Sequence, residues 1–360
     1  MPQGNPSSPF NFFPPRGLRL RPLLFAALAL GCLARAPGAQ AQTRPEWWSA
    51  FNDATLNLLL AESAPPVAAA QPPQALLALQ LQADATAAYV LARVASARLA
   101  NGQLLVDTLQ RQLELLRADG QEHSEAGLAA QKTLQSLQVR LPQFEAQRTA
   151  SIALLAQRSG GARSVAVLSR QLGPALGDAR LPVPSFDVPR ELPGIVLRQR
   201  PDVAQAESEL SQASRDSGAA QLRLARYLQA LAAPIPAAAV VEAPHADADA
   251  AAQPEDVLER ARRDIAAKLG ELGAAVEAAK AQEAMLHTLQ PQYLALRERF
   301  QRGEVPEAQL LGAMARMLVE EDRLAASSGQ LAIAWIAFQA SIGGAGNATT
   351  SQLLGAQRGE

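Results

Sequence analysis

A long run of small and apolar residues, alternately three and four positions apart, is the feature that most constrains what this chain can fold into. The run begins at Ala85 and ends at Leu116. Because this spacing keeps the residues on one stripe of a helix over roughly four heptads, it predicts the seam of a coiled coil. The members of the run are Ala85, Ala88, Ala92, Ala95, Leu99, Gly102, Val106, Leu109, Leu113 and Leu116.

The seam is expected to belong to a helical hairpin, and the sequence predicts two such hairpins. The first spans 75–158 and turns at Gly120, and the second spans 254–343 and turns at Gly303. Glycine directly after a helical stretch is a common helix terminator. The fold class predicted is therefore all-α, with long antiparallel coiled-coil hairpins in an internal repeat. Such a chain has little room for an enclosed active site.

The other segments are predicted from their prolines and apolar residues. An N-terminal amphipathic segment, expected to be one short helix, covers 43–63, a loop or linker covers 159–199, and a Pro/Ala-rich linker covers 233–253. A helix is expected over 200–232, because Pro201 suits the first helical position and Asp202 the first turn. A flexible tail is expected over 344–360.

The N-terminus has the composition of an export signal. Three arginines precede an apolar run over 23–33 that is too short to span a bilayer. Two processing sites are open: a signal peptide over 1–41 that ends at Ala41, or a lipoprotein signal that ends before Cys32 and makes that cysteine a lipid anchor. Both place the mature protein outside the cytoplasm. No later stretch is expected to be a membrane helix.

Composition argues against several classes of function. Lys and Arg number 33 against 34 Asp and Glu, so no basic excess indicates nucleic-acid binding. The sequence has no nucleophile elbow, phosphate loop or paired cysteines, and we expect neither an enzyme nor a cofactor. His123, His245 and His287 are too far apart for a metal motif, so no metal site is expected.

Four short motifs occur in order along the chain: Trp47-Trp48-Ser49-Ala50-Phe51-Asn52-Asp53, then Leu192-Pro193 with Leu197-Arg198-Gln199-Arg200-Pro201-Asp202-Val203, then Arg299-Phe300-Gln301-Arg302-Gly303, and finally Ala337-Phe338-Gln339-Ala340 with Gly343-Gly344. Together they resemble the bacterial outer-membrane efflux proteins, the TolC-like exit ducts of tripartite pumps. The resemblance is closest to the branch that is often lipid-anchored. The stretch around Arg200-Pro201-Asp202 is its most specific part.

The resemblance implies a passive duct in the outer membrane, with helices in the periplasm, built as a homotrimer. A periplasmic adaptor and an inner-membrane pump would be its partners. The hairpin tips would dock to the adaptor, which assigns that role to Arg117, Asp119, Gly120, Phe300, Arg302 and Gly303. The resemblance does not indicate which substrate is exported.

The chain departs from the family where the family's membrane strands would be. The connections at 64–74 and 233–253 are short and rich in proline and alanine, so we expect the β-barrel strands to be largely or wholly missing. An alternative function therefore stays open: a periplasmic coiled-coil interaction protein, or a degenerate paralogue, that conducts nothing.

Overall fold

The computed structural model describes residues 47–63, 72–158, 163–178, 181–184, 188–215, 217–237 and 253–344. The chain divides into two compact units, 1–43 and 44–360, and every described residue lies in the second. The predicted signal peptide and Cys32 lie outside the described residues. So do most of the linker over 233–253 and all of the tail after Gly344.

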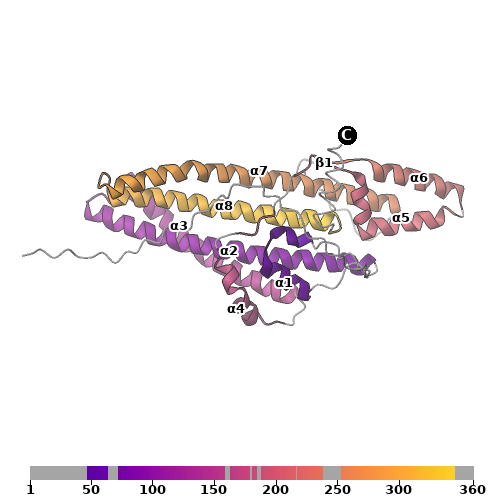
Figure 1. The fold of residues 1–360 in the computed structure, drawn as a ribbon, viewed down its shortest axis with the longest axis horizontal. Coiled ribbons are helices and arrows are strands. Elements are labelled where there is room, and N and C mark those ends of the chain that lie inside the picture. Colours follow the sequence, from indigo (N-terminus) through magenta and orange to yellow (C-terminus); the bar gives the residue numbers. More distant parts are fainter. Residues whose placement is uncertain are drawn as a thin grey trace, which may run out of the picture. The chain divides into compact units, whose positions relative to one another are not determined.

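Two long helical hairpins dominate the fold (Figure 1). The first pairs α2 (Pro72–Ala118) with α3 (Glu125–Arg158). The second pairs α7 (Pro254–Gln301) with α8 (Glu307–Ser341). The prolines at 142 and 291 lie inside α3 and α7, which both continue through them. The predicted all-α class with long helical hairpins is confirmed.

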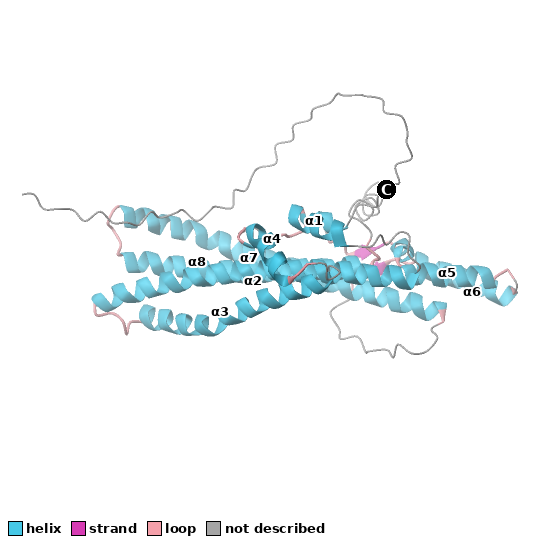
Figure 2. Ribbon diagram, turned by 90° about the horizontal axis from the view of Figure 1, so that it is seen from below, coloured by secondary structure: helices cyan, strands magenta, loops and turns pink. Residues whose placement is uncertain are grey.

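The four long helices form an open layer. Helix α2 packs along both α3 and α8, and α8 packs along α7, whereas α3 and α7 do not pack along each other. Figure 2 shows the order α7, α8, α2, α3 at the end where both hairpins turn. In a closed four-helix bundle the first and last helices of this series would also meet. Here α3 and α7 are the edges of the layer.

The α2 seam explains how its helix can contact two others. Ala88, Ala92 and Ala95 are fully buried, and their small side chains let neighbouring backbones approach closely. Nearer the turn the seam changes to leucine, with Leu109, Leu113 and Leu116 buried. One 18-residue stretch of this helix, within Gln74–Ala118, is long and apolar enough to cross a membrane, which the sequence analysis did not expect. However, 61% of that stretch is buried inside the protein, as in a core helix.

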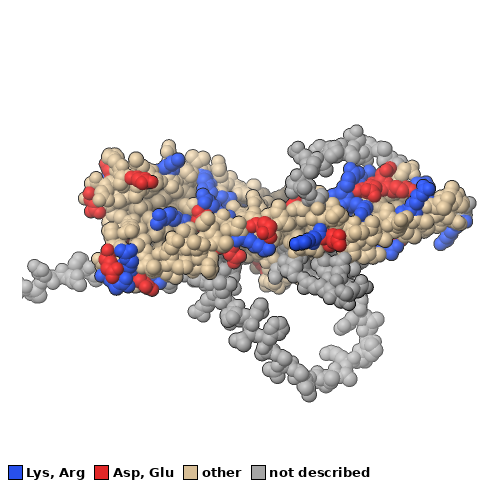
Figure 3. All heavy atoms as spheres, turned by 90° about the horizontal axis from the view of Figure 1, so that it is seen from above, with Lys and Arg blue, Asp and Glu red and all other residues tan. Residues whose placement is uncertain are grey.

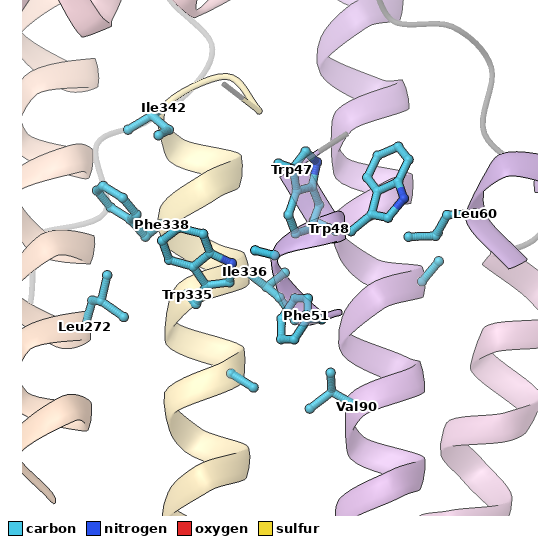
Figure 4. Packing of buried hydrophobic residues seen from close by; sticks show 14 of the residues in the cluster. Trp47, Trp48, Phe51, Leu60, Val90, Leu272, Trp335, Ile336, Phe338 and Ile342 are labelled. Atoms are coloured by element: carbon cyan, nitrogen blue, oxygen red, sulfur yellow. The ribbon is translucent and has the colours of Figure 1, made fainter. Parts of the chain in front are cut away.

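The N-terminal aromatic residues pack onto the layer at the end away from the turns, with Trp47 and Phe51 between α2 and α8 and Trp48 toward Leu60 (Figure 4). Trp47, Trp48 and Phe51 belong to a short 3-10 helix, η1 (Trp47–Phe51), and all three are buried. Phe51 lies between Val90 and Ile336 (Figure 4). The burial of these rings fixes the start of the described chain onto the layer.

The predicted single helix over 43–63 is wrong, because η1 and α1 (Ala54–Ser63) are separate. Asn52 has a φ of 50°, which ends η1. Asp53 then caps α1, since its Oδ1 accepts hydrogen bonds from the backbone N–H of Thr55 (2.9 Å) and Leu56 (3.1 Å). Its other oxygen accepts from Arg93 Nη1 on α2 at 2.9 Å.

The predicted single helix over 200–232 is also wrong. Helix α5 (Pro201–Ala213) ends before residues 214–217, and α6 (Gly218–Ala232) returns along it as a third hairpin. The stretch at 214–218 is polar and ends in glycine, a composition that favours a turn. The Tyr227 hydroxyl donates to the Val203 carbonyl at 3.1 Å and joins the two helices.

The predicted loop over 159–199 contains regular structure. Helix α4 (Val165–Leu176) begins at Ser164, whose side chain accepts a hydrogen bond from the Val167 N–H, and it tolerates a proline in its last turn. A 3-10 helix, η3 (Gly194–Gln199), follows strand β1 (Glu191–Leu192). This strand pairs antiparallel with β2 (Ile235–Pro236), with Leu192 opposite Ile235. Among the described residues these two short strands are the only sheet.

Candidate docking tips and assembly edges

The two hairpin turns have the same backbone geometry. Gly120 has a φ of 68° and Gly303 a φ of 73°, the left-handed conformation that ends many helices. After the first glycine, the N–H of Gln121 donates to the Leu116 carbonyl at 2.7 Å. After the second, the N–H of Glu304 donates to the Arg299 carbonyl at 2.9 Å. In each turn, a backbone N–H after the glycine thus forms a hydrogen bond with a carbonyl near the end of the helix, so this carbonyl needs no capping side chain.

Each tip pairs an arginine from the end of one helix with a glutamate just after the glycine. Arg117 Nε donates to Glu122 Oε2 at 3.0 Å. In the second tip, both Arg302 and Arg299 contact Glu304, and the hydrogen bond from Arg302 holds the pKa of that carboxyl below its usual range. Charged side chains of both signs gather at this end (Figure 3).

Most of the predicted docking residues lie on the surface of the tips. Asp119, Gly120, Arg302 and Gly303 are exposed, as is Arg117. Phe300 differs, because it is half-buried against a small cluster formed by Tyr293, Leu310 and Met317. The structure therefore places Phe300 inside the second hairpin, where it supports the tip.

A contact between the hairpins holds the tips together. Arg111 of α2 donates from Nε and Nη2 to the two carboxylate oxygens of Glu307, at 3.3 Å each. Glu307 is the first residue of α8, so the bond lies close to the second tip. His123, beside the first tip, is exposed and lies 3.4 Å from Glu122. No group of three metal-ligating side chains occurs among the described residues.

The arginine of the mid-chain motif joins three helices. Arg200 donates to both oxygens of Asp202 at the start of α5 (3.1 and 2.9 Å) and to Asp264 of α7 at 2.8 Å. It also donates to the Ser341 carbonyl at the end of α8, at 2.9 Å. Burial disfavours its charge, but the bonds to these carboxylates raise its pKa above the usual value. The motif that carried the family resemblance is thus a structural tie.

A second tie, which the sequence analysis missed, holds the two hairpins together midway. Asp322 of α8 accepts two hydrogen bonds from Arg98 of α2 (2.8 and 3.2 Å) and one from Arg140 of α3 (2.6 Å). The three residues are far apart in sequence, so no local pattern marks them. We call this trio the Asp322 clasp.

The edge helices expose apolar side chains at matching distances from the turns. On α3, Leu128 and Val139 are exposed, 8 (128 − 120) and 19 (139 − 120) residues after Gly120. On α7, Leu294 and Met285 are exposed, 9 (303 − 294) and 18 (303 − 285) residues before Gly303. Within the helices, Leu128 and Val139 lie 3 (128 − 125) and 14 (139 − 125) residues after the start of α3, and Leu294 and Met285 lie 7 (301 − 294) and 16 (301 − 285) residues before the end of α7.

Comparison with solved structures supports the fold, whereas comparison of sequences assigns no family. No family model matches the chain, and neither does any curated protein. Among solved structures, it is similar to CusC, described in a study of folding and transmembrane channel formation, with 17% identity and a TM-score of 0.53 over 76% of this chain and 79% of that one. It is also similar to the outer-membrane channel OprN, with 17% identity and a TM-score of 0.52 over 88% and 99%. A membrane protein from Pseudomonas aeruginosa matches with 16% identity and a TM-score of 0.50 over 83% and 74%. The resemblance to outer-membrane efflux ducts that the motifs indicated is confirmed at the level of the fold.

Proposed function

We propose that this protein is a duct-type component of a tripartite export system in the cell envelope. It would act passively at the outer membrane, with its long hairpins in the periplasm. The fold that it shares with CusC and the channel OprN supports this function. The described residues hold no cluster of metal-ligating side chains that would argue for a separate chemical role.

The open layer is the observation that carries the proposal. A layer whose two edges differ, one formed by α3 and the other by α7, can join edge to edge with further copies of itself. Such head-to-tail contacts generate a ring when the rotation closes. The exposed apolar side chains Leu128 and Val139 of one copy would then face Leu294 and Met285 of the next. A ring of three copies would form a helical tunnel.

The tips would dock to a periplasmic adaptor, which in turn would connect to an inner-membrane pump. Both turns lie at the same end of the layer, and Arg111 with Glu307 holds them together. The exposed residues that we assign to this contact are Arg117, Asp119, Gly120, Arg302 and Gly303, supported from inside by Phe300.

Cross-linking tests the ring directly. The double variant Val139→Cys with Met285→Cys places one thiol on each edge helix, 14 (139 − 125) and 16 (301 − 285) residues from the turn end of α3 and of α7. Oxidation of the purified protein should give covalent dimers and a closed trimer on a non-reducing gel. Each single variant, which keeps Cys32 as the double variant does, should give no trimer. A double variant that stays monomeric, or that cross-links no better than the single variants, would refute the ring.

A second candidate is a periplasmic interaction protein that binds efflux partners without conducting. The third hairpin favours it, because α6 packs back along α5 where the resemblance implies that membrane strands would follow. A recording of the purified protein in a planar lipid bilayer distinguishes the two functions. Reproducible single-channel conductance would exclude the interaction protein, whereas a cross-linked trimer without conductance would favour it.

A further inference from the structure

A groove of about 340 Å³ lies between α2, α8 and the edge helix α3. Its floor is apolar and includes Leu105, Leu137 and Leu318. Its charged side chains are mostly basic. The residues that carry charge along it are Arg98, Lys132, Arg140, Asp322 and Arg323.

The cations of this groove outnumber the carboxylates that contact them. Asp322 binds Arg98 and Arg140, and Glu320 accepts a hydrogen bond from Arg323 Nη1 at 2.6 Å. Lys132 has no carboxylate partner in the part of the chain that the structure describes, and it is exposed. Four cations against two carboxylates leave an excess of two positive charges (4 − 2) beside an apolar floor.

The two guanidinium groups of the Asp322 clasp are fixed in place before any ligand arrives. Both lie near the ring of Phe144, at 4.2 Å for Arg98 and 5.4 Å for Arg140 from the guanidinium carbon to the ring centre. A cation over an aromatic face is attracted by it, and the shared carboxylate restricts both side chains further. Side chains that are already ordered lose little entropy when they bind a ligand.

We propose that this groove binds a small organic anion with an apolar body. The anionic group would contact Lys132, Arg140 and Arg323, and the apolar body would cover the leucine floor. The volume lies in the range of small-molecule sites, about 300–1,000 Å³. Ser136, which also lines the groove, supplies a neutral hydrogen-bond donor. The groove is lined by residues of one copy of the chain, and its Lys132 shares a face of α3 with Val139 of the proposed edge contact.

A pair of dyes tests the proposal with the full-length protein. The anionic dye 8-anilinonaphthalene-1-sulfonate and its neutral analogue N-phenyl-1-naphthylamine differ by the sulfonate, and both fluoresce on binding. We expect the anionic dye to bind more tightly. Lys132→Gln should weaken its Kd roughly tenfold, the value of one hydrogen bond to a charged group. The affinity for the neutral dye should not change.

Two further variants make the result specific. Lys280→Gln is the same chemical change on the exposed surface of α7, outside the groove, and should leave both affinities as they are. Lys132→Arg keeps the positive charge and should retain most of the binding. Equal affinity of the unmodified protein for the two dyes would overturn the proposal. So would an equal effect of Lys132→Gln and Lys280→Gln, or of Lys132→Gln and Lys132→Arg.

Discussion

Gly303 and Gly273 show how much a single backbone conformation matters in this protein. A Cβ added at either position would meet no atom within 4 Å, so packing does not distinguish them. Gly303 has a φ of 73° at the second tip, whereas Gly273 lies inside α7. Any difference in the free energy of unfolding between the two alanine variants must therefore come from the backbone conformation.

We expect Gly303→Ala to lower the free energy of unfolding by about 1 kcal/mol, because alanine is strained in the left-handed conformation. Gly273→Ala should instead raise the free energy of unfolding by roughly 0.5–1 kcal/mol, since alanine favours a helix and restricts the unfolded chain. Urea denaturation followed by circular dichroism measures both. Changes of the same sign in the two variants would contradict this account of the tip.

Glu321 gives stability a dependence on pH. Burial raises the pKa of this carboxyl on α8 above its usual value. At low pH both the folded and the unfolded chain carry the proton, so the group has no effect. As pH rises through the unfolded pKa, the unfolded state ionises first, and the free energy of unfolding falls until the folded pKa is passed.

Glu321→Gln removes this ionisation, so it should raise the melting temperature at neutral pH and change it little in acid, where the carboxyl is protonated in both states. Thermal unfolding across the acid-to-neutral range checks this result. Glu277→Gln, at an exposed position of α7 paired with Lys280, is the control and should show no such gain. A gain that is equal at all pH values would show that Glu321 acts through its shape and not through its charge.

Among the helices and strands, α5 depends on long-range contacts that its own sequence does not show. Arg200 reaches α7 and the end of α8 as well as Asp202 beside it. The planar guanidinium group can form hydrogen bonds with Asp202, Asp264 and the Ser341 carbonyl at once, whereas a lysine ammonium is a single point charge.

We therefore expect Arg200→Lys to lower the free energy of unfolding by about 2 kcal/mol. Arg198→Lys is the matched control, since Arg198 also makes a two-bond contact, with Glu207, but is more exposed. It should lose less than about 1 kcal/mol. Urea denaturation of both variants measures the two changes in the free energy of unfolding. Equal changes would contradict the prediction that Arg200 contributes more to stability than Arg198.

The elements that the sequence predicted well are those with strong local signals. The seam of α2 and the glycine at each turn are local patterns, and the long helices lie where the patterns indicated them. The break between α5 and α6 was missed although the stretch at 214–218 is polar and ends in glycine, a composition that favours a turn. Helix α4 was missed because the prolines around it indicated a loop, although a proline in its last turn is tolerated.

The site could be predicted only where it is local. The tips follow from glycine and arginine next to each other in sequence, and Arg302 is exposed there, whereas its docking role stays a prediction. Phe300 was expected at the same surface but packs inward, because the apolar residues of α8 lie opposite it. The Asp322 clasp joins residues 224 positions apart, a separation at which a single sequence holds no pairing signal.

In the whole molecule, the hairpins must behave as one layer if their edges are to join copies into a duct. The coiled-coil faces of α2 and α8 provide most of that contact. The Asp322 clasp adds a partly buried polar connection across three helices, with 14% of the Asp322 side chain exposed. Removing one partner of such a cluster leaves the other charges without compensation.

Asp322→Asn would place the two arginines beside a neutral amide and next to each other. We expect it to lower the free energy of unfolding by about 2 kcal/mol, less than for a fully buried pair because Arg140 is partly exposed. Glu277→Gln breaks an exposed pair within α7 and should lower the free energy of unfolding by less than about 0.5 kcal/mol.

Urea denaturation should be followed both by circular dichroism, which reports all helices, and by tryptophan fluorescence, which reports the aromatic core around Trp335. If the clasp couples the hairpins, the two transitions should coincide in the unmodified protein and separate in Asp322→Asn, whereas coincident and unshifted transitions would mean that apolar packing alone joins them.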